Sequence, residues 1–255
     1  MDLKIRGRVA LVTGGSAGLG KAIALGLAVE GVKIAVAARR RERLEEVVRA
    51  ARERGAQEAR AYDVDLSDGS GVNSLLERVE SDYGTPDILI LNGGGPKPGT
   101  VSEVSLEDWD DAYRSMLRNM LELAGAVVPS MRRRKWGRIV ALASSSVKQP
   151  IPSLALSNSM RVALVSALKT LSMDVAADGV TVNAIATGRV DTDRLRELYP
   201  DETSMKRAAK DEIPIGRVAT ADEYAPMAVF LCSELARYVT GQTIAIDGGL
   251  IKSLY

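Results

Sequence analysis

The sequence predicts a single α/β domain with a doubly wound parallel sheet of about seven strands. Short apolar, β-branched runs alternate with longer amphipathic stretches along the chain. This alternation is typical of βαβ units with helices on both faces of a sheet. A glycine-rich turn joins the first apolar run to the first helical stretch, and no Pro/Ser-rich linker interrupts the series. We therefore expect one domain over residues 1–255.

Each expected strand is a short apolar run, and each expected helix shows apolar residues at a helical period. The expected strands are Val9–Val12, Lys33–Ala38, Ala59–Tyr62, Ile88–Leu91, Arg138–Leu142, Val180–Ile185 and Thr243–Ile246. The expected helices are Leu19–Glu30, Arg41–Arg54, Ser70–Tyr83, Leu106–Arg134, Leu154–Ala177 and Ala221–Ser233. The charged segment Asp191–Pro214 breaks this rhythm, so we interpret it as a candidate substrate lid.

Composition excludes several classes of protein. Apolar residues make up 46% of the 255 residues, which excludes a disordered chain, and the net charge of +1 gives no case for nucleic-acid binding. The basic run Arg132–Lys135 is interpreted as a solvated helix C-terminus. Cys232 is the only cysteine and histidine is absent, so disulfides, histidine bases and histidine metal sites are excluded. Without a signal-peptide pattern or membrane-spanning run, we expect a cytoplasmic protein with no metal.

The most informative motif is the glycine-rich turn Thr13-Gly14-Gly15-Ser16-Ala17-Gly18-Leu19-Gly20. It follows the first apolar run and opens the first helical stretch. Open α/β proteins hold a diphosphate at such a turn, because glycine lets the backbone approach the anion and the first helical N–H groups face it. The motif predicts a dinucleotide site.

The second expected strand is followed by Arg39, Arg40 and Arg41. In dinucleotide sites the residue at this strand end meets the ribose 2′ position, where an acid favours NAD and an arginine accommodates a 2′-phosphate. A merely basic first helical turn is the alternative, but it would oppose the helix dipole. We therefore predict NADP(H) in preference to NAD(H), with Arg39 at the phosphate.

Polar residues and glycines follow the third and fourth expected strands, where ligands bind in this architecture. These are Asp63-Val64 and Asn92-Gly93-Gly94-Gly95. Asp63 is alternatively a turn residue and the glycine triplet a chain reversal, although three glycines also let a flat ligand approach the backbone.

Several motifs in order carry a resemblance to a known family. They are Thr13–Gly20, Asp63-Val64, Asn92–Gly94, Gly137–Val140, Val182–Ile185, Gly188 with Thr192, and Asp247–Gly249. Together they resemble the classical short-chain dehydrogenase/reductase family, near the 3-oxoacyl-carrier-protein reductases. The resemblance implies a Rossmann-type fold of seven parallel strands, a nicotinamide dinucleotide and a homotetramer.

The same resemblance implies roles for individual residues. Gly14, Ser16, Gly18, Leu19 and Gly20 would hold the diphosphate. Asp63 and Val64 would flank the adenine, Asn92, Gly93 and Gly94 the adenosine ribose side, and Gly188, Val190 and Thr192 the nicotinamide.

The catalytic positions depart from the family pattern, which uses an Asn, a Ser and a Tyr-x-x-x-Lys pair. The Ser position holds Ser144, the Tyr position Ser157, the Lys position Arg161 and the Asn position Met116. An aliphatic hydroxyl is a poor general acid, and an arginine cannot shuttle protons, but it can stabilise an oxyanion or bind the cofactor ribose. Alternatively, Ser157 is a packing residue and Arg161 forms an interface ion pair.

Three functions remain open. The first is an NADP(H)-dependent oxidoreductase acting on a carbonyl or alcohol, in which Ser144 holds the carbonyl oxygen and Ser157 is a proton relay or pocket wall. The second is a cofactor-binding sensor or assembly subunit without turnover. The third is non-redox chemistry, such as elimination or hydration, in the same pocket. Lys97 is interpreted as a solvated loop residue, with a substrate-anion contact or a tuned amine as the alternatives.

Overall fold

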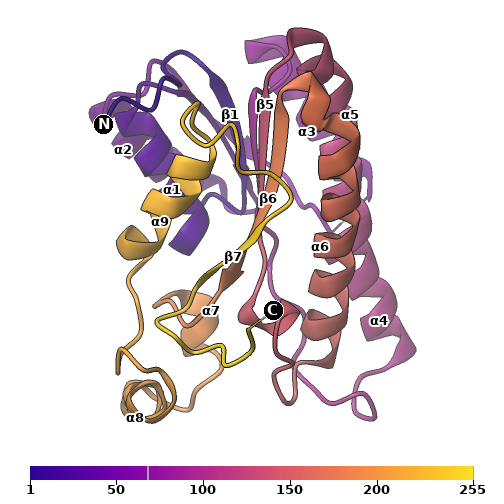
Figure 1. Cartoon of the computed structure of the whole chain (residues 1–255), viewed down its shortest axis with the longest axis vertical. Coiled ribbons are helices and arrows are strands. Elements are labelled where there is room, and N and C mark those ends of the chain that lie inside the picture. The colour runs from indigo at the N-terminus through magenta and orange to yellow at the C-terminus, as the bar shows by residue number, and fades with distance from the viewer. Residues whose placement is uncertain (68, 255) are drawn as a thin grey trace.

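The computed structural model describes residues 1–67 and 69–254. Its centre is a sheet of seven parallel strands in the order β3-β2-β1-β4-β5-β6-β7 (Figure 1). This order confirms the predicted Rossmann-type, doubly wound sheet. From β1 to β3 successive strands are added toward one edge of the sheet, and from β4 to β7 they are added toward the other edge. The strands are β1 (Val9–Thr13), β2 (Lys33–Ala38), β3 (Ala59–Asp63), β4 (Ile88–Leu91), β5 (Gly137–Leu142), β6 (Val180–Thr187) and β7 (Thr243–Ile246).

Helices cover both faces of the sheet, as the apolar character of its strands requires. Helices α1 (Gly18–Val29), α2 (Arg41–Glu53) and α9 (Ala221–Leu231) pack on one face. Helices α3 (Gly69–Tyr83), α5 (Asn119–Arg134) and α6 (Ala155–Val175) pack on the other, at the right of Figure 1. β1, β4 and β5 are buried along their whole length, so side chains of each strand contribute to a core on both faces.

The prediction of one continuous helix over 106–134 is wrong. It consists of α4 (Leu106–Ala112), a π-helical stretch η1 (Tyr113–Arg118) and α5. Ser115 donates its hydroxyl to the Asp111 carbonyl at 2.7 Å, and such back-bonding disturbs the regular helical ladder. Met116, at the family's Asn position, is buried within η1 against Leu156.

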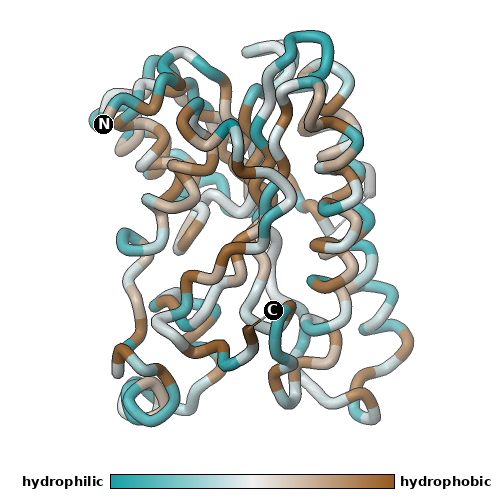
Figure 2. The backbone as a smooth tube through the Cα atoms, viewed as in Figure 1, coloured by the Kyte–Doolittle hydropathy of each residue, from teal (hydrophilic) through white to brown (hydrophobic). Residues whose placement is uncertain are grey.

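The segment Asp191–Pro214 contains two helices, α7 (Asp193–Arg196) and α8 (Glu202–Glu212). Each begins at a side-chain cap: Thr192 accepts the Leu195 N–H and Asp201 accepts the Ser204 N–H. Both helices lie beyond the sheet, at the same end of the molecule as the start of α6 (Figure 1). In Figure 2, α8 is largely hydrophilic, and its outer residues are exposed.

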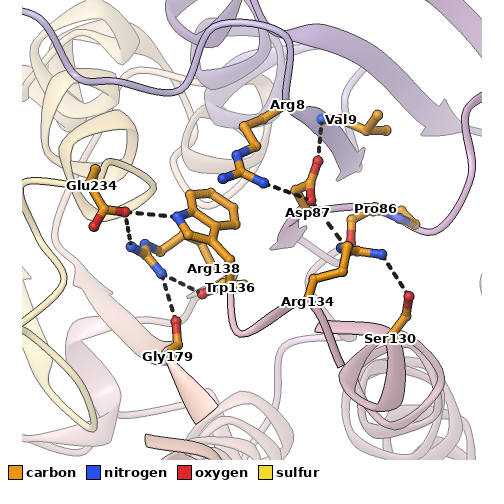
Figure 3. Close-up of polar contacts among 11 residues, drawn as sticks. Arg8, Val9, Pro86, Asp87, Ser130, Arg134, Trp136, Arg138, Gly179 and Glu234 are labelled. Carbon is orange, nitrogen blue, oxygen red and sulfur yellow. Dashed lines mark hydrogen bonds and ion pairs between the residues drawn. The ribbon is translucent and has the colours of Figure 1, made fainter. Parts of the chain in front are cut away.

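The opposite end of the sheet is closed by a polar network (Figure 3). Arg138 is only 1% exposed, and its Nη2 lies 3.1 Å from Glu234 Oε2. Trp136 Nε1 donates to the same oxygen at 2.8 Å. The guanidinium groups of Arg8 and Arg138 lie 3.9 and 4.3 Å from the Trp136 ring centroid. This network joins β5 to the segment after α9.

The basic run Arg132–Lys135 occupies the C-terminal end of α5, as predicted. Arg132 and Lys135 both pair with Asp178. Their positive charges therefore lie favourably at the C-terminal end of the helix dipole and join α5 to the segment before β6.

Candidate active site

The glycine-rich turn connects β1 to α1 and is locked against the end of β4. Thr13 Oγ1 accepts the Asn92 N–H at 2.8 Å and lies 3.1 Å from the Ile90 carbonyl oxygen. Asn92 Nδ2 donates to the Gly14 carbonyl at 3.2 Å. These contacts hold the turn through the protein's own groups.

Two glycines are required by this geometry. Gly14 has φ of +58°, and a Cβ there would lie 2.7 Å from the Asn92 carbonyl oxygen. A Cβ on Gly20 would lie 2.3 Å from the Gly14 carbonyl oxygen. The N-cap residue of α1, Ala17, offers no side-chain cap, which leaves the first helical N–H groups for an anion.

A cleft of about 1060 Å³ opens at the carboxyl ends of the strands, between the glycine-rich turn, the start of α6 and the segment with α7. Its volume suits a large ligand. Most of the residues predicted to bind cofactor line it: Gly14, Ser16, Gly18, Leu19, Arg39, Asn92, Gly93, Gly94, Gly188, Val190 and Thr192.

Three predicted cofactor residues lie outside the cleft lining. Gly20 is buried behind the turn. The Asp63 carboxylate lies 3.0 Å from Arg41 Nη1 and 3.4 Å from Arg78 Nη2, and the hydrogen bond from Arg41 lowers the pKa of Asp63. Val64 donates its N–H to the Ala38 carbonyl at 3.0 Å, which continues the β3–β2 ladder. The adenine contacts of Asp63 and Val64 stay predictions.

Arg39 and Arg41 differ in how their side chains are held. Arg41 is bound by Glu45 and Asp63 on the surface of α2. Arg39 is exposed and lines the cleft, and within residues 1–67 and 69–254 its side chain forms no ion pair or hydrogen bond. Its guanidinium is therefore available to a ligand phosphate.

The three candidate catalytic residues line the same cleft. Ser144 follows β5, and its hydroxyl accepts the Ser146 N–H at 3.1 Å. Arg161, on α6, donates from Nη1 to the Leu142 carbonyl at 2.8 Å and from Nε to Ser157 Oγ at 3.2 Å. The local fold thus places α6 so that Arg161 spans from Ser157 to the end of β5.

The charge on Arg161 is poorly compensated. No carboxylate of the described chain pairs with it, and burial lowers its pKa to about 10, with the charge of Arg194 acting in the same direction. The group is still protonated near neutral pH. Its interactions with neutral oxygen atoms leave a positive charge facing the cleft, where an anion or a developing oxyanion would be stabilised.

Sequence reasoning missed a group of cleft residues in the loop after β6 and in the candidate lid. Arg189 follows Gly188, pairs with Glu212, and lies 5.8 Å from the Tyr199 ring centroid. Arg189 Nη1 is buried without a hydrogen-bond partner among the described residues. No local pattern joins these residues, which come together because β6 and the lid flank the same cleft.

Arginine contacts join the candidate lid, Asp191–Pro214, to other segments around the cleft. Arg194 Nη2 donates to the Pro96 carbonyl at 2.7 Å, and Arg43 of α2 lies 3.3 Å from Asp193 Oδ2. Lys97 is exposed, lies outside the cleft lining, and pairs with Asp108 at 2.9 Å. That position agrees with a solvated loop lysine.

The part of the chain that the structure describes contains no group of three acidic, His or Cys side chains placed to hold a metal ion. Among its helices, none combines the length and the apolar character needed to cross a bilayer.

Comparison with known proteins agrees with this architecture. A family model described as enoyl-(acyl carrier protein) reductase matches residues 14–251. The 3-oxoacyl-[acyl-carrier-protein] reductase FabG of Escherichia coli K12 is 30% identical over 256 residues, which cover 97% of this chain and 99% of FabG.

Solved structures give the same result. L-sorbose reductase of Gluconobacter frateurii, complexed with NADPH and L-sorbose, superposes with a TM-score of 0.94 and 35% identity over 100% of both chains. YwfH, an NADPH-dependent reductase involved in bacilysin biosynthesis, superposes with a TM-score of 0.92 and 30% identity over 97% of this chain and 100% of YwfH. The chain therefore belongs to the short-chain dehydrogenase/reductase family, near the 3-oxoacyl-[acyl-carrier-protein] reductases.

Proposed function

We propose that the protein is an NADP(H)-dependent oxidoreductase that transfers hydride between the nicotinamide and a carbonyl or alcohol substrate. The observation that carries this proposal is the convergence of Ser144, Ser157 and Arg161 on the cleft that also contains the glycine-rich turn. A dinucleotide with its diphosphate at the turn would extend along the strand ends toward these three side chains.

Within this site, each residue has a chemical role that suits its contacts. The Ser144 hydroxyl would hold the carbonyl oxygen. Arg161, anchored by Leu142 and Ser157, would bind the ribose hydroxyls or stabilise the oxyanion through its uncompensated charge. Ser157 would be a relay for a proton from water, or a wall of the pocket.

This site departs from the family pattern, since Ser157 and Arg161 stand where a Tyr and a Lys are expected. A serine hydroxyl is a weaker acid than a phenol. Loss of a tuned acid removes about 10²–10⁴ of rate, so slow turnover is expected rather than none.

NADP(H) is proposed over NAD(H) because Arg39, which has no side-chain partner among the described residues, lines the cleft at the end of β2. NADPH is also the cofactor named for the sorbose reductase and for YwfH. The nicotinamide end would lie near Gly188, Val190 and Thr192.

We further propose that residues 191–214 close over the substrate. The hydrogen bond from Arg194 to the Pro96 carbonyl would hold this segment in the closed position. Self-association as a homotetramer is supported by apolar side chains on the outer side of α6, where Val162 is 46% and Met173 66% exposed.

A stopped-flow experiment tests the proposal. The protein is mixed with NADPH and a panel of acyl, sugar and small ketone substrates, and nicotinamide absorbance is followed. We expect slow oxidation of NADPH with at least one carbonyl, and Arg161→Met should reduce the rate by about 10²–10³. Arg161→Lys should retain part of it, and Arg133→Met, an exposed arginine of α5, serves as the matched control.

Other outcomes would identify the alternatives. Tight NADPH binding without hydride transfer to any substrate would contradict the proposal and favour a cofactor-binding sensor or assembly subunit. Product formation without a change in nicotinamide absorbance would instead indicate elimination or hydration in the same cleft.

A further inference from the structure

The end of β6 carries a hydroxyl that lies between the hydrophobic core and the cleft. Thr187 is the last residue of β6 and lines the cleft. Its Oγ1 lies 2.7 Å from the phenol oxygen of Tyr224, on α9. Tyr224 is 0% exposed and belongs to the core between α9 and the sheet. The pair therefore joins a buried phenol to a residue that lines the cleft.

The environment of Tyr224 determines the direction of this hydrogen bond. Among the described residues, Thr187 Oγ1 is the only hydrogen-bond partner of the phenol. If Thr187 donated to Tyr224, the phenol proton would be buried among apolar side chains without an acceptor, which is unfavourable. Tyr224 must therefore donate and Thr187 accept. Burial also raises the pKa of Tyr224, so the phenol keeps its proton at any ordinary pH.

The proton of the Thr187 hydroxyl is then available to the cleft. A threonine hydroxyl has one O–H donor and two acceptor lone pairs, and Tyr224 occupies one lone pair, so the O–H proton stays free to be donated. Gly188 and Val190, predicted to meet the nicotinamide, follow directly in the chain and line the same cleft. Arg161 is close enough for its charge to lower the pKa of Tyr224, against the effect of burial. The hydroxyl pair thus lies near the candidate catalytic residues.

We propose that Thr187 is a ligand-binding residue that donates a hydrogen bond to a carbonyl oxygen in the cleft, and that Tyr224 is the positioning residue that makes it a donor. The carbonyl belongs either to the carboxamide of the nicotinamide or to the substrate. This inference rests on the proposed function for the identity of the ligand.

The test is a double-mutant cycle with Thr187→Val and Tyr224→Phe, alone and combined. Cofactor affinity is measured by NADPH fluorescence titration, and kcat and KM are measured for the substrate found by stopped flow. Thr187→Val should weaken the affected step about 10-fold, as expected for one lost hydrogen bond. Tyr224→Phe should give a smaller loss, and the double variant should match Thr187→Val alone. Thr187→Ser, which keeps the hydroxyl, should retain near wild-type values.

The measured parameter identifies the source of the carbonyl. A higher Kd for NADPH with unchanged substrate KM indicates the carboxamide. An unchanged Kd with lower kcat/KM indicates the substrate carbonyl. Tyr238→Phe removes the hydroxyl of a tyrosine that is 100% exposed, and it should change neither parameter.

Two results would overturn the inference. One is a Thr187→Val variant with wild-type cofactor affinity and turnover. This single variant is enough to test the role of Thr187 if Tyr224→Phe does not fold. The other is additivity of the two single changes, since independent residues add and coupled ones do not. The wild-type protein separates this failure from that of the proposed function. If the wild type binds no NADPH, the proposed function fails first; if it turns over normally while Thr187→Val has no effect, only the inference fails.

Discussion

At the scale of single residues, the cleft contains arginines that are held in opposite ways. Arg161 is anchored at two atoms by Leu142 and Ser157, so its charge has a fixed position. Arg39 has no partner in the described part of the chain and is exposed at the cleft rim. A fixed charge suits a reacting atom, whose position is set by chemistry, whereas an exposed guanidinium without a protein partner suits a ligand phosphate.

Arg39→Ala should weaken NADPH binding by about 10- to 100-fold, because a charge-assisted hydrogen bond to a phosphate is lost. NADH affinity should not change, since NADH lacks the 2′-phosphate. Fluorescence titration of both cofactors checks this. Arg49→Ala, an exposed arginine on α2, is the matched control. Equal losses for NADPH and NADH would contradict the assigned contact.

At the scale of elements, the sequence predicted best what depends on consecutive residues. The bounds of β2, β4 and β7 match the apolar runs, and the glycine-rich turn lies where its own residues place it. The π-helical stretch was missed because its apolar periodicity continues that of α4 and α5. Helices α7 and α8 were missed because charged residues dominate them, although the caps Thr192 and Asp201 were present as signals.

In the candidate site, too, the sequence predicted residues of local motifs but not residues that only the tertiary fold brings together. Ser144, Ser157 and Arg161 were predicted only through the family resemblance, as the residues at its Ser, Tyr and Lys positions after β5 and on α6. Thr187 and Tyr224 are 37 residues apart, and Arg189 and Glu212 are 23 apart, so only the tertiary fold pairs them. Arg39 was predicted as the phosphate ligand, but only the structure shows that Arg41, two residues on, is already occupied by Asp63.

The start of α9 provides a pH-dependent element. Thr220 and Glu223 form a capping box, and Arg217 lies 2.6 Å from Glu223 Oε1. The hydrogen bond from Arg217, followed by that from the Thr220 N–H, lowers the pKa of Glu223 to about 2. Because the folded-state pKa lies below the unfolded value, the stabilisation is present above the unfolded pKa and is lost as pH falls toward 2.

Glu223→Gln should therefore lower the midpoint of urea unfolding at pH 7. The difference from wild type should shrink as pH is lowered from 5 toward 3, because the wild-type carboxylate progressively loses its advantage. Unfolding curves at several pH values measure this. A difference that stays constant with pH would show that the carboxylate charge plays no part.

At the scale of the whole molecule, the candidate site and a stabilising polar network lie at opposite ends of the sheet. The cleft lies at the carboxyl ends of the strands, and the Arg138–Trp136–Glu234 network lies at the amino ends (Figure 3). Arg138 also donates to the carbonyls of Ser233 and Gly179, at 3.0 and 3.1 Å. The network therefore holds β5 against the chain before β6 and the chain after α9.

Glu234→Ala should destabilise the fold by about 1–3 kcal/mol, since it leaves a buried guanidinium without its carboxylate but with its carbonyl acceptors. Turnover per folded molecule should stay at the wild-type value, because the change lies at the far end of the sheet. Chemical denaturation and active-site-normalised rates measure the two effects. Glu46→Ala, an exposed glutamate on α2, is the control. A matching loss of turnover would contradict the separation.

The bonds that join Thr13, Gly14 and Asn92 have a kinetic consequence. They close the glycine-rich turn through the protein's own groups, so the diphosphate of the proposed cofactor would meet a cradle that is already shaped. Little conformational entropy then remains to be lost when the nucleotide arrives at this turn. Association at the diphosphate would be a single encounter step, and any slower phase of binding would arise elsewhere, at the segment carrying α7 and α8.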